Sequence, residues 1–498
     1  MIKTKIRNSV KKVTKKLEEK FGPGTRWDQL QTHSEGSHGG VNKIKVTCYG
    51  GAEEVTGSNF MLEYKGKSVL IDCGLPQGQD SHHKEWIPFG YDVSKVDFLL
   101  VTHAHMDHIG RIPFLVKSGF RGKIFSTKPT KEMALPAFND ALHILTKDLD
   151  NGKIEELPYQ QHDIDITMSI WKTVEYHENL LLTKDLNAKL FNSAHVLGSA
   201  FIQLICKNND FKNTNQKVLF TGDMGINSLL LQEPDIPMDS DIVFMESVYG
   251  GRLHEDIKTR NKKLFDCIKD VIEKRSTLVI PAFAIERTQE ILAEINNFVE
   301  SHKLPIVPVF LDSPLAIEMT KVFHKHKELM SEKIQRQIAG GDDIFKFPGL
   351  HITDRKEESQ GIGRVNGPKV IIAGSGMVAG GRVVHHVRDY LESDKNTILL
   401  AGYQAVGTYG RLLSEGKKEI VFYGELLQVR AKIIQLSGYS AHRDQNSLLD
   451  FVKIISKNCK SLNLILGDKI SLLEFQKVLY ERQSIHSHIC IAKEVIEF

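Results

Sequence analysis

Residues 101–110, VTHAHMDHIG, place four potential metal ligands within six positions. The apolar segment before them, residues 97–101, predicts a short strand. In a loop at the end of a strand, residues two apart can point inward together, so these side chains can converge on a small volume. Imidazole nitrogens and carboxylate oxygens suit Zn²⁺, and also Mn²⁺ or Fe. The sequence therefore predicts metal binding by His103, His105, Asp107 and His108.

Three further candidate ligands lie in similar contexts at the ends of predicted strands. His195 lies in NSAHVLGSA, Asp223 in FTGDMG and His442 in LSGYSAHRD. A carboxylate can bridge two cations, and Asp223 is the expected bridge. Asp72, in VLIDCG, is expected to hold a ligating histidine in one tautomer and orientation. A single loop histidine would be read as a surface residue, but the whole set favours a metal centre.

The composition is typical of a globular protein with several domains. The chain has 498 residues, of which 41% are hydrophobic and 26% charged. At roughly 100–200 residues per domain, this length predicts two to four domains. These values exclude a fibrous chain and a mainly disordered one.

The charge is distributed unevenly along the chain. The net charge of +3 does not by itself suggest a nucleic-acid partner. Residues 1–20 contain eight Lys or Arg and two Glu, so this stretch carries +6 and the rest of the chain −3. A basic helix and a Gly-rich linker are expected to form an extension over residues 1–42. It could contact an RNA backbone, another protein or an anionic membrane surface, or stay a solvated extension.

The cysteines and the apolar segments indicate the cellular compartment in which the protein is expected. Six scattered cysteines without a C-x-x-C pair suggest free thiols, which fit a reducing environment. The N-terminus lacks the apolar region of a secretory signal, and no run of about 18 apolar residues exists. We therefore expect a cytoplasmic protein without membrane insertion.

The periodicity of the chain changes twice. Strand-like segments dominate residues 43–245, including a hairpin over residues 60–71 with its turn at Lys65-Gly66-Lys67. From about residue 254, strands and helices alternate, which predicts a parallel sheet covered by helices. Strand-like segments return at 419–422 and 431–436, before a helix at 444–456. Domain boundaries are therefore expected at residues 43, 246 and 431.

Several motifs resemble one family when they are read in order along the chain. HAHMDH resembles the H-x-H-x-D-H motif of the metallo-β-lactamase superfamily, and Asp72, His195 and Asp223 resemble the motifs around it. Glu246, in MESVYG, resembles the first motif of the β-CASP nucleases. The similarity spans about residues 43–460 and favours the RNA-processing exonuclease/endonuclease type, related to the eukaryotic pre-mRNA 3′-end cleavage subunit. Further similar segments are IPAFAIERTQEIL, LDSPLA, IIAGSGMVAGGRVVHH, GYQAVGTYGR and GYSAHRD.

This resemblance implies an α/β fold and a metal centre. An αββα metallo-β-lactamase sandwich, residues 43–245 and 431–498, would contain an inserted Rossmann-like β-CASP domain, residues 246–430. Two Zn²⁺ ions are implied, with Mn²⁺ as the alternative. One would be held by His103, His105, His195 and Asp223, and the other by Asp107, His108, Asp223 and His442. The expected catalytic carboxylates are Asp72, Asp107, Asp223 and Glu246; the alternative for Glu246 is a purely structural role.

Other residues are expected to hold the phosphate chain of a substrate. Gly374, Ser375 and Gly376 follow an apolar strand, where backbone N–H groups and a hydroxyl can cradle a phosphate. Arg287 and Arg382 could make bidentate phosphate contacts, and their positions resemble phosphate-contacting parts of the family. Without the family context, each would be read as an ordinary loop or helix start.

The sequence departs from the family pattern at three positions. The eukaryotic cleavage subunits have a histidine, the family's general acid, ten residues beyond the glycine that corresponds to Gly402, where this chain has Leu412. His385 or His386 could substitute for it. Glu286 stands before Arg287 where relatives often have glycine, and Leu466 replaces a histidine. Metal ligation is therefore expected to be intact, whereas protonation of the leaving group has no assigned donor.

The function that the resemblance implies is zinc-dependent hydrolysis of phosphodiester bonds in single-stranded RNA. A hydroxide activated by the two metals would attack the phosphorus. One alternative is a catalytically weak RNA-binding or scaffold paralogue, which the change at Leu412 keeps open. Another is a small-molecule metallohydrolase, although small substrates do not require such a large insertion. The sequence leaves the oligomeric state open; relatives are often dimers, so a homodimer is one alternative.

Overall fold

The computed structural model describes residues 43–77, 85–208, 215–226, 228–255, 257–402 and 404–498. The basic extension expected over residues 1–42 lies outside these ranges. Ile44–Phe498 is one structural unit. All the elements below belong to this unit.

The first sheet has seven strands in the order β22-β1-β2-β3-β4-β5-β6. The predicted hairpin is confirmed: Tyr64 pairs with Lys67, and positive φ angles at Lys65 (49°) and Gly66 (71°) form the tight turn between β2 and β3. The strand bounds are β1 Lys45–Gly50, β2 Asn59–Tyr64, β3 Lys67–Ile71, β4 Phe98–Leu100, β5 Lys123–Ser126, β6 Trp171–Thr173 and β22 Val495–Glu497.

The second sheet also has seven strands, in the order β21-β20-β11-β10-β9-β8-β7. It joins residues far apart in the chain, since β11 pairs in parallel with both β10 and β20. The strand bounds are β7 Leu180–Leu181, β8 Leu186–Asn192, β9 Ala200–Cys206, β10 Gln216–Phe220, β11 Ile242–Glu246, β20 Ser461–Ile465 and β21 His488–Ile489.

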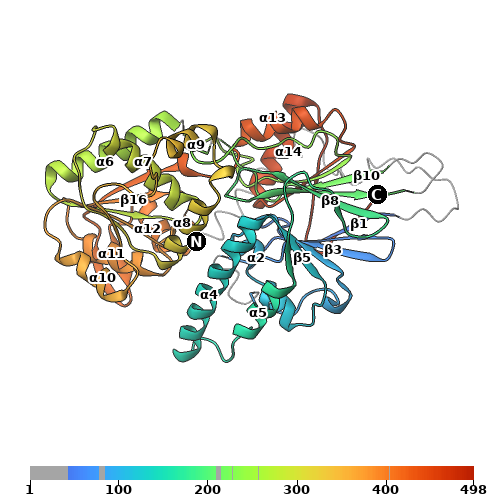
Figure 1. The fold of residues 1–498 in the computed structure, drawn as a ribbon, viewed down its shortest axis with the longest axis horizontal. Coiled ribbons are helices and arrows are strands. Elements are labelled where there is room, and N and C mark those ends of the chain that lie inside the picture. Colours follow the sequence, from blue (N-terminus) through green and yellow to red (C-terminus); the bar gives the residue numbers. More distant parts are fainter. Residues whose placement is uncertain (1–42, 78–84, 209–214, 227, 256, 403) are drawn as a thin grey trace, which may run out of the picture. The chain divides into compact units, whose positions relative to one another are not determined.

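The two sheets pack face to face, and helices cover their outer faces. Val46, Phe60 and Ile71 of the first sheet share a buried cluster with Phe220 and Phe244 of the second. Helices α3 to α5 pack on the other face of the first sheet, and α13 and α14 on that of the second (Figure 1). The predicted αββα sandwich is therefore confirmed. The helix bounds are α2 Met106–Ile109, α3 Ile112–Lys117, α4 Lys128–Asp150, α5 Gln161–Ile170, α13 Gln445–Ile455 and α14 Lys469–Gln483.

The inserted domain is built on a parallel sheet with the strand order β14-β13-β15-β12-β16-β19. Along β12, Leu278 and Ile280 pack toward α6 and α7, while Val279 packs toward α11. Helices therefore cover both faces, which explains the continuous apolar strands. The strand bounds are β12 Thr277–Pro281, β13 Val309–Leu311, β14 Leu350–Ile352, β15 Lys369–Ala373, β16 Thr397–Ala401 and β19 Lys432–Leu436.

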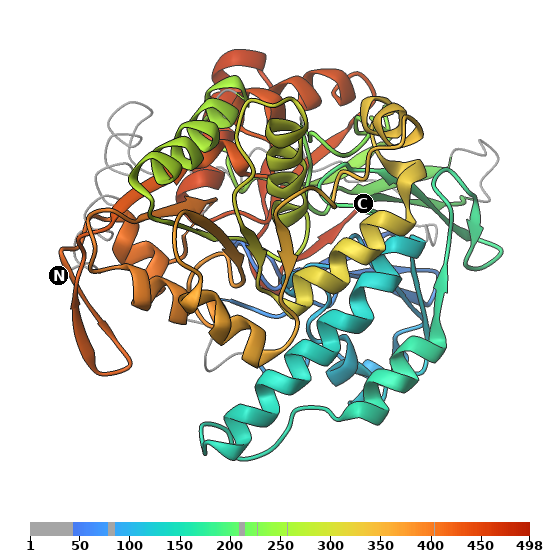
Figure 2. The ribbon, with the colours of Figure 1, turned by 60° about the vertical axis from the view of Figure 1, so that its left-hand side comes forward.

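The helices and one hairpin complete this domain. The helix bounds are α6 Ile257–Lys274, α7 Arg287–Glu300, α8 Pro314–Lys325, α9 Glu332–Ala339, α10 Lys356–Gly361, α11 Arg382–Tyr390 and α12 Tyr409–Ser414. The separate hairpin consists of β17 Glu419–Phe422 and β18 Glu425–Gln428. Helix α8 of this domain lies beside α4 of the sandwich, where Lys325 forms an ion pair with Glu132 (Figure 2).

The pairing of strand β19 shows where the chain leaves the inserted domain and returns to the sandwich. It pairs in parallel with β16 along its whole length, so it belongs to the sheet of the inserted domain. The boundary expected at residue 431 therefore precedes this strand, and the first element of the returning sandwich is α13. Among the helices of the described ranges, none combines the length and apolar character that crossing a membrane would require.

Candidate metal centre

Connections at strand ends carry every predicted ligand. His103 and His105 follow β4, and α2 begins directly after His105 and carries Asp107 and His108. The other three come from distant parts of the chain. His195 lies between β8 and β9, Asp223 follows β10, and His442 follows β19.

Two glycines allow these connections to approach one another closely. Gly222 has a φ of 50°, and a Cβ atom there would lie 2.7 Å from the Cβ of Thr102. A Cβ atom on Gly225 would lie 1.8 Å from the carbonyl oxygen of Ala194. Both glycines flank Asp223 in FTGDMG, so this motif lets the aspartate sit against the histidine loops.

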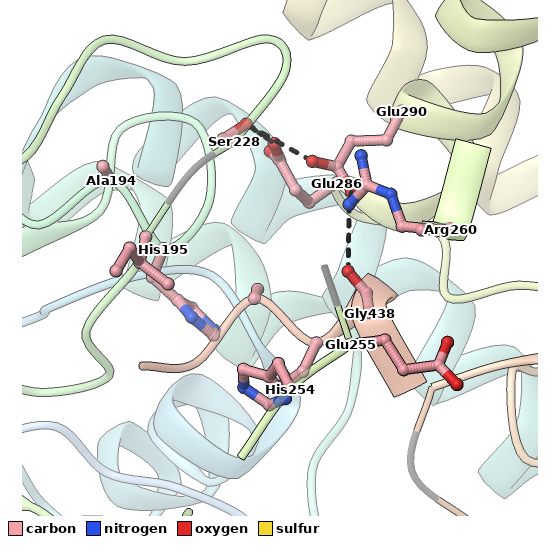
Figure 3. Close-up of a pocket in the computed structure, with 12 residues that line it drawn as sticks. Ala194, His195, Ser228, His254, Glu255, Arg260, Glu286, Glu290 and Gly438 are labelled. Carbon is pink, nitrogen blue, oxygen red and sulfur yellow. Dashed lines mark hydrogen bonds and ion pairs between the residues drawn. The ribbon is translucent and has the colours of Figure 1, made fainter. Parts of the chain in front are cut away.

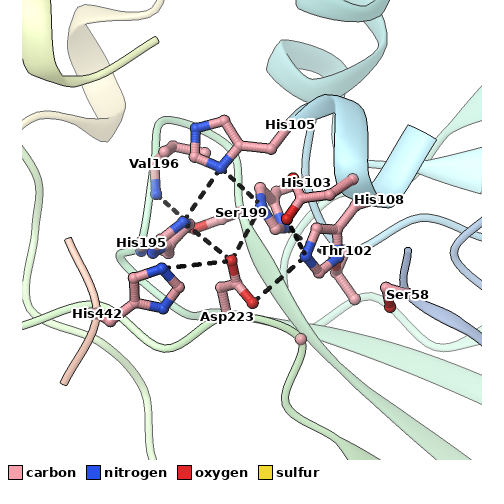
Figure 4. A network of polar contacts seen from close by, with 12 residues as sticks. Ser58, Thr102, His103, His105, His108, His195, Val196, Ser199, Asp223 and His442 are labelled. Atoms are coloured by element: carbon pink, nitrogen blue, oxygen red, sulfur yellow. Dashed lines mark hydrogen bonds and ion pairs between the residues drawn. The ribbon is translucent and has the colours of Figure 1, made fainter. Parts of the chain in front are cut away.

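Four histidines surround the Asp223 carboxylate (Figure 4). Its Oδ2 atom lies 3.3 Å from His195 Nε2, 3.6 Å from His103 Nε2 and 3.9 Å from His442 Nε2. Its Oδ1 atom lies 3.3 Å from His108 Nε2. The carboxylate expected to bridge two cations is therefore at the centre of the cluster.

The remaining two predicted ligands contact members of this group. His105 Nδ1 lies 3.0 Å from His103 Nε2 and 3.3 Å from His195 Nε2. Asp107 Oδ2 lies 4.0 Å from His108 Nε2. The structure thus brings all seven predicted ligands together in one buried or half-buried cluster.

Asp72 lies directly behind His108. Its Oδ2 atom is 2.7 Å from His108 Nδ1 and accepts hydrogen bonds from the hydroxyls of Thr102 and Ser58, at 2.8 and 3.1 Å. Its Oδ1 atom accepts a hydrogen bond from the Thr102 backbone N–H at 2.7 Å. A fully buried carboxylate held in this way fixes the ring of His108 and leaves its Nε2 atom facing Asp223.

Glu246 stands in the same relation to His442. Its Oε1 atom lies 3.1 Å from His442 Nδ1 and accepts a hydrogen bond from Met224 N at 2.7 Å. Its Oε2 atom accepts one from Val248 N at 3.2 Å. Because Nδ1 of His442 is engaged, Nε2 is the nitrogen that faces the cluster.

Burial sets the protonation of several cluster residues. It lowers the pKa of His103 and His195 well below the usual value, with help from neighbouring histidines, and lowers that of His105 to about 3. These three imidazoles are therefore neutral at pH 7, the form that binds a metal. Although burial alone would raise the pKa of Asp223, the facing histidines, His108 above all, hold it well below its usual range.

The donor set fits divalent cations that take mixed nitrogen and oxygen ligands. His108 Nε2 is buried and makes no hydrogen bond of normal geometry within the described residues, although it lies beside Asp223, which suits a nitrogen directed at a cation. The described part of the chain contains two groups of residues whose potential ligand atoms lie close together. Within each group, these atoms all lie within 4.8 Å of one another. The first group is His103, His105, His195 and Asp223, and the second is Asp223, Glu246 and His442.

The first group matches the ligand set expected for one ion. In the second group, Glu246 stands where the resemblance implies Asp107 and His108. The Glu246 carboxylate accepts hydrogen bonds from two backbone N–H groups and lies 3.1 Å from His442 Nδ1, so other groups of the protein already engage it.

The two arginines expected to contact phosphate form ion pairs within the protein. Arg287 is buried, pairs with Glu290 and lies over the Tyr439 ring, with its guanidinium carbon 5.4 Å from the ring centroid. Arg382 donates to Asp312 Oδ1 at 2.7 Å, and 23% of its side chain is exposed. Their contact with a substrate stays a prediction.

Ser375 and Gly376 lie in the turn after β15. The Ser375 hydroxyl accepts a hydrogen bond from Ala379 N at 3.0 Å. A Cβ atom at Gly376 would lie 2.7 Å from the Phe283 ring, so glycine is required for this packing. The expected phosphate cradle likewise stays a prediction.

The residues considered for the missing histidine lie in other surroundings. Leu412, in α12, packs against the apolar cluster under α11. His386 Nε2 is 2.6 Å from Asp312 Oδ2, and the His385 ring stacks on Tyr423 with centroids 6.3 Å apart. Both histidines are thus engaged within the inserted domain.

Sequence reasoning missed two side chains that hold the ligand loops. His254 Nε2 lies 2.9 Å from the carbonyl oxygen of His442, and the only sequence signal is its position in MESVYGGRLH, just after Glu246. The Ser199 hydroxyl accepts hydrogen bonds from the backbone N–H groups of His195 and Val196, at 3.0 and 3.2 Å. A serine in a loop carries no comparable signal.

Models of known protein families match most of the folded unit. The model described as the Beta-Casp domain matches residues 288–413. The model described as the Zn-dependent metallo-hydrolase RNA specificity domain matches residues 426–490. A third, described as the anti-Pycsar protein Apyc1, matches residues 47–272.

Individual proteins are similar over nearly the whole chain. Ribonuclease TTHA0252 of Thermus thermophilus is 31% identical over 437 residues, which cover 88% of this chain and 96% of that protein. An RNase J-like protein of Methanocaldococcus jannaschii is 32% identical over 459 residues, covering 91% and 99%. Cleavage and polyadenylation specificity factor 73 of Drosophila melanogaster is 28% identical over 424 residues, covering 83% and 58%.

Among solved structures, the fold resembles the crystal structure of a protein of unknown function from Enterococcus faecalis V583. The TM-score is 0.52 at 12% identity, over 92% of this chain and 100% of that one. This similarity concerns the fold alone.

The sandwich and its buried His/Asp cluster define the class of metallo-β-lactamase-type, metal-dependent hydrolases. Within that class, the chain belongs to the β-CASP nuclease family of the metallo-β-lactamase superfamily. The family resemblance found in the sequence motifs and the expected fold are therefore both confirmed.

Proposed function

We propose that the protein is a zinc-dependent ribonuclease that hydrolyses phosphodiester bonds in single-stranded RNA. The observation that carries this proposal is the cluster of seven predicted ligands with Asp223 at its centre, in which three buried imidazoles are neutral. The names of two relatives, a ribonuclease and an RNase J-like protein, and the RNA specificity domain matched at residues 426–490 support RNA as the substrate. A role in RNA processing or decay follows from that chemistry.

Two Zn²⁺ ions are proposed, with Mn²⁺ as the alternative. Bound at this cluster, they would lower the pKa of water and offset the negative charge on the phosphoryl oxygens. His103, His105, His195 and Asp223 would hold one ion, and Asp107, His108, Asp223 and His442 the other.

The chain's own carboxylates organise this cluster. Asp72 and Glu246 each engage Nδ1 of one histidine, so that Nε2 of His108 and of His442 points toward Asp223. Such carboxylates raise the basicity of the imidazole and prevent rotation of the ring. We assign Asp72 and Glu246 to this positioning role, and Asp107 and Asp223 to direct ligation.

Contacts to the phosphate chain are proposed for residues of the inserted domain. Arg287 and Arg382 offer guanidinium groups, and Ser375 and Gly376 lie in the turn after β15. Each arginine would have to exchange or share its carboxylate partner, Glu290 or Asp312, to bind a phosphate. A cytoplasmic location and a homodimer stay predictions, the former consistent with six free cysteines.

One experiment tests the proposal directly. The purified protein is assayed for zinc per chain and incubated with single-stranded RNA labelled at the 5′ or the 3′ end. We expect bound zinc and metal-dependent cleavage, with product ladders that separate endonuclease from exonuclease activity. The double variant His103→Ala/Asp107→Ala should lose both. Full activity of that variant, or a wild-type protein without metal and without cleavage, would contradict the proposal.

A further inference from the structure

A small polar cavity lies beside the ligand His195 (Figure 3). Its volume is about 50 Å³, enough for a few water-sized groups. His195, Ser228, His254, Arg260, Glu286 and Glu290 are among the residues that line it. Of the seven predicted ligands, His195 is the one that lines this cavity, so the cavity lies between that ligand and charged side chains of the inserted domain.

Glu286 is the least expected residue in this wall. Its φ and ψ angles are 65° and −53°, and Arg287 N donates to the carbonyl oxygen of Ile285 at 2.8 Å, closing a tight turn around it. Residues other than glycine rarely adopt these backbone angles. The family resemblance also leads one to expect glycine at this position. A buried glutamate that persists in a strained turn beside an active centre points to a role for its carboxyl group.

The carboxyl group of Glu286 is poorly supported by hydrogen bonds. Its Oε1 atom accepts a hydrogen bond from the Ser228 hydroxyl at 2.9 Å, while its buried Oε2 atom accepts none from the residues that the structure describes. By contrast, the neighbouring Glu290 forms an ion pair with Arg287, and its Oε2 atom lies 3.9 Å from Arg260 Nη1. Glu286, which lines the cavity, therefore has one carboxyl oxygen without a hydrogen bond from the described residues.

The charges around the cavity leave Glu286 without a cation of its own in the described part of the chain. Arg260 Nη2 donates to Glu294 Oε1 at 2.7 Å, and Glu294 also accepts from the buried Tyr439 hydroxyl. Two guanidinium groups, of Arg260 and Arg287, thus face three buried carboxyl groups, of Glu286, Glu290 and Glu294. The charges balance when one carboxyl group is protonated, and Glu286 is the one that forms no ion pair among the described residues.

The pKa of Glu286 agrees with this assignment. Burial and the charge of Glu290 raise it to about 8, and Ser228, Arg287 and the Leu197 backbone amide offset this only in part. The other ionisable groups lining the cavity are His195, His254 and Glu255. Burial lowers the pKa of both histidines, so they are neutral, and Glu255 pairs with Lys263 at 2.6 Å. Glu286 is thus a neutral acid near pH 7.

We propose that Glu286 is the proton donor to the leaving oxygen of the substrate, in place of the histidine that is missing at Leu412. This inference rests on the proposed phosphodiesterase activity. Water forms a new bond to phosphorus, the bond from phosphorus to the ribose oxygen breaks, and that oxygen keeps the electron pair and takes the proton of Glu286. The proton that the attacking water loses to solvent is matched by the proton that later returns the glutamate to its acid form.

Two substrates distinguish this role from a structural one. A ribose alkoxide must be protonated as it leaves, whereas p-nitrophenolate is a good leaving group without a proton. Glu286→Gln should therefore reduce RNA cleavage by about 10²–10⁴-fold, the usual contribution of general acid catalysis. Hydrolysis of a p-nitrophenyl phosphodiester should fall far less, and zinc per chain should not change.

Three further variants complete the design. Glu286→Asp retains an acid and should recover part of the RNA activity. Glu286→Gly relaxes the backbone turn, so it should fold even if Glu286→Gln does not, and it should show the same selective loss. Glu255→Gln makes the same chemical change in the same cavity wall and should alter both rates by the same factor.

An equal loss on both substrates, or no loss on RNA in any Glu286 variant, would overturn the assignment of Glu286. If the wild-type protein cleaves neither substrate, the proposed function itself fails. The two failures are therefore distinguishable.

Discussion

Glu246 shows how one residue can control a metal ligand from behind. Its carboxylate is fixed by two backbone N–H groups and lies 3.1 Å from His442 Nδ1. Glu246→Gln keeps the size of the side chain but loses the charge that favours the N–H form of Nδ1. We expect zinc affinity to fall about 10–100-fold, as measured by competition with a chelator. Glu332→Gln, at an exposed carboxylate, is the control, and an unchanged affinity for Glu246→Gln would refute the positioning role.

Asp312 leads to a prediction about acid stability. It pairs with Arg382 and His386 and accepts a hydrogen bond from Ser359 at 2.6 Å. Burial alone would raise its pKa, but His386, Ser359 and Arg382 lower it from 3.8 to about 2. Because the pKa is lower in the folded state, the carboxylate stabilises the protein above pH 3.8, and this contribution disappears as the pH falls toward 2.

Asp312→Asn removes that contribution at every pH. Arg382 and His386 lose their carboxylate partner, so the free energy of unfolding at pH 7 should fall by about 3–5 kcal/mol. Urea unfolding should also show a smaller loss of stability between about pH 4 and pH 2 than the wild type. Asp389→Asn, at an exposed position of α11, is the matched control. Parallel pH curves for wild type and Asp312→Asn would contradict the prediction.

At the scale of the residue, the sequence predicts ligands better than it predicts their surroundings. All seven proposed ligands meet, because each follows a strand and the strand ends lie together. The cavity wall around Glu286 could not be predicted, because it combines Ser228, Arg260 and Glu290 from three separate segments. The turn at Glu286 depends on a φ angle that nothing in the local pattern specifies.

At the scale of the element, local patterns predict where the strands lie, and tertiary pairing decides which sheet each strand joins. Glu419–Phe422 has the bounds predicted from the sequence. Helix α4 was not predicted, and its buried residues occupy only the first half, so its apolar pattern is incomplete. The pairing of β19 with β16 joins segments far apart in the chain, which local periodicity cannot reveal.

The loops of the metal centre yield a prediction at the same scale. Gly225→Ala would place a Cβ atom 1.8 Å from the Ala194 carbonyl oxygen, so the loops of Asp223 and His195 would have to separate. We expect a loss of about 1–3 kcal/mol in the free energy of unfolding and less zinc per chain. Gly361→Ala is the control, since no described atom lies within 4 Å of its Cβ position. Normal zinc content in a stable Gly225→Ala protein would show that the loops tolerate separation.

At the scale of the whole molecule, formal charge is a poor guide to RNA binding. The proposed centre contains Asp107 and Asp223, whose charges are counted, whereas the cations that would offset them are not. The formal charge of −3 on residues 21–498 therefore understates the positive potential that RNA would meet at the site. Elsewhere on the folded unit, the same net charge limits non-specific binding of RNA.

Residues 1–20, with eight Lys or Arg, are then the natural source of sequence-independent RNA affinity. Deleting residues 1–40 should weaken RNA binding and flatten the dependence of log Kd on log salt, by roughly 0.7 for each phosphate of single-stranded RNA that the extension neutralises. Binding measured at two salt concentrations tests this. A full-length variant with the eight basic residues changed to glutamine should behave like the deletion, which separates charge from chain length. Equal salt slopes for all three proteins would show that the extension does not bind RNA, and that affinity resides in the folded unit alone.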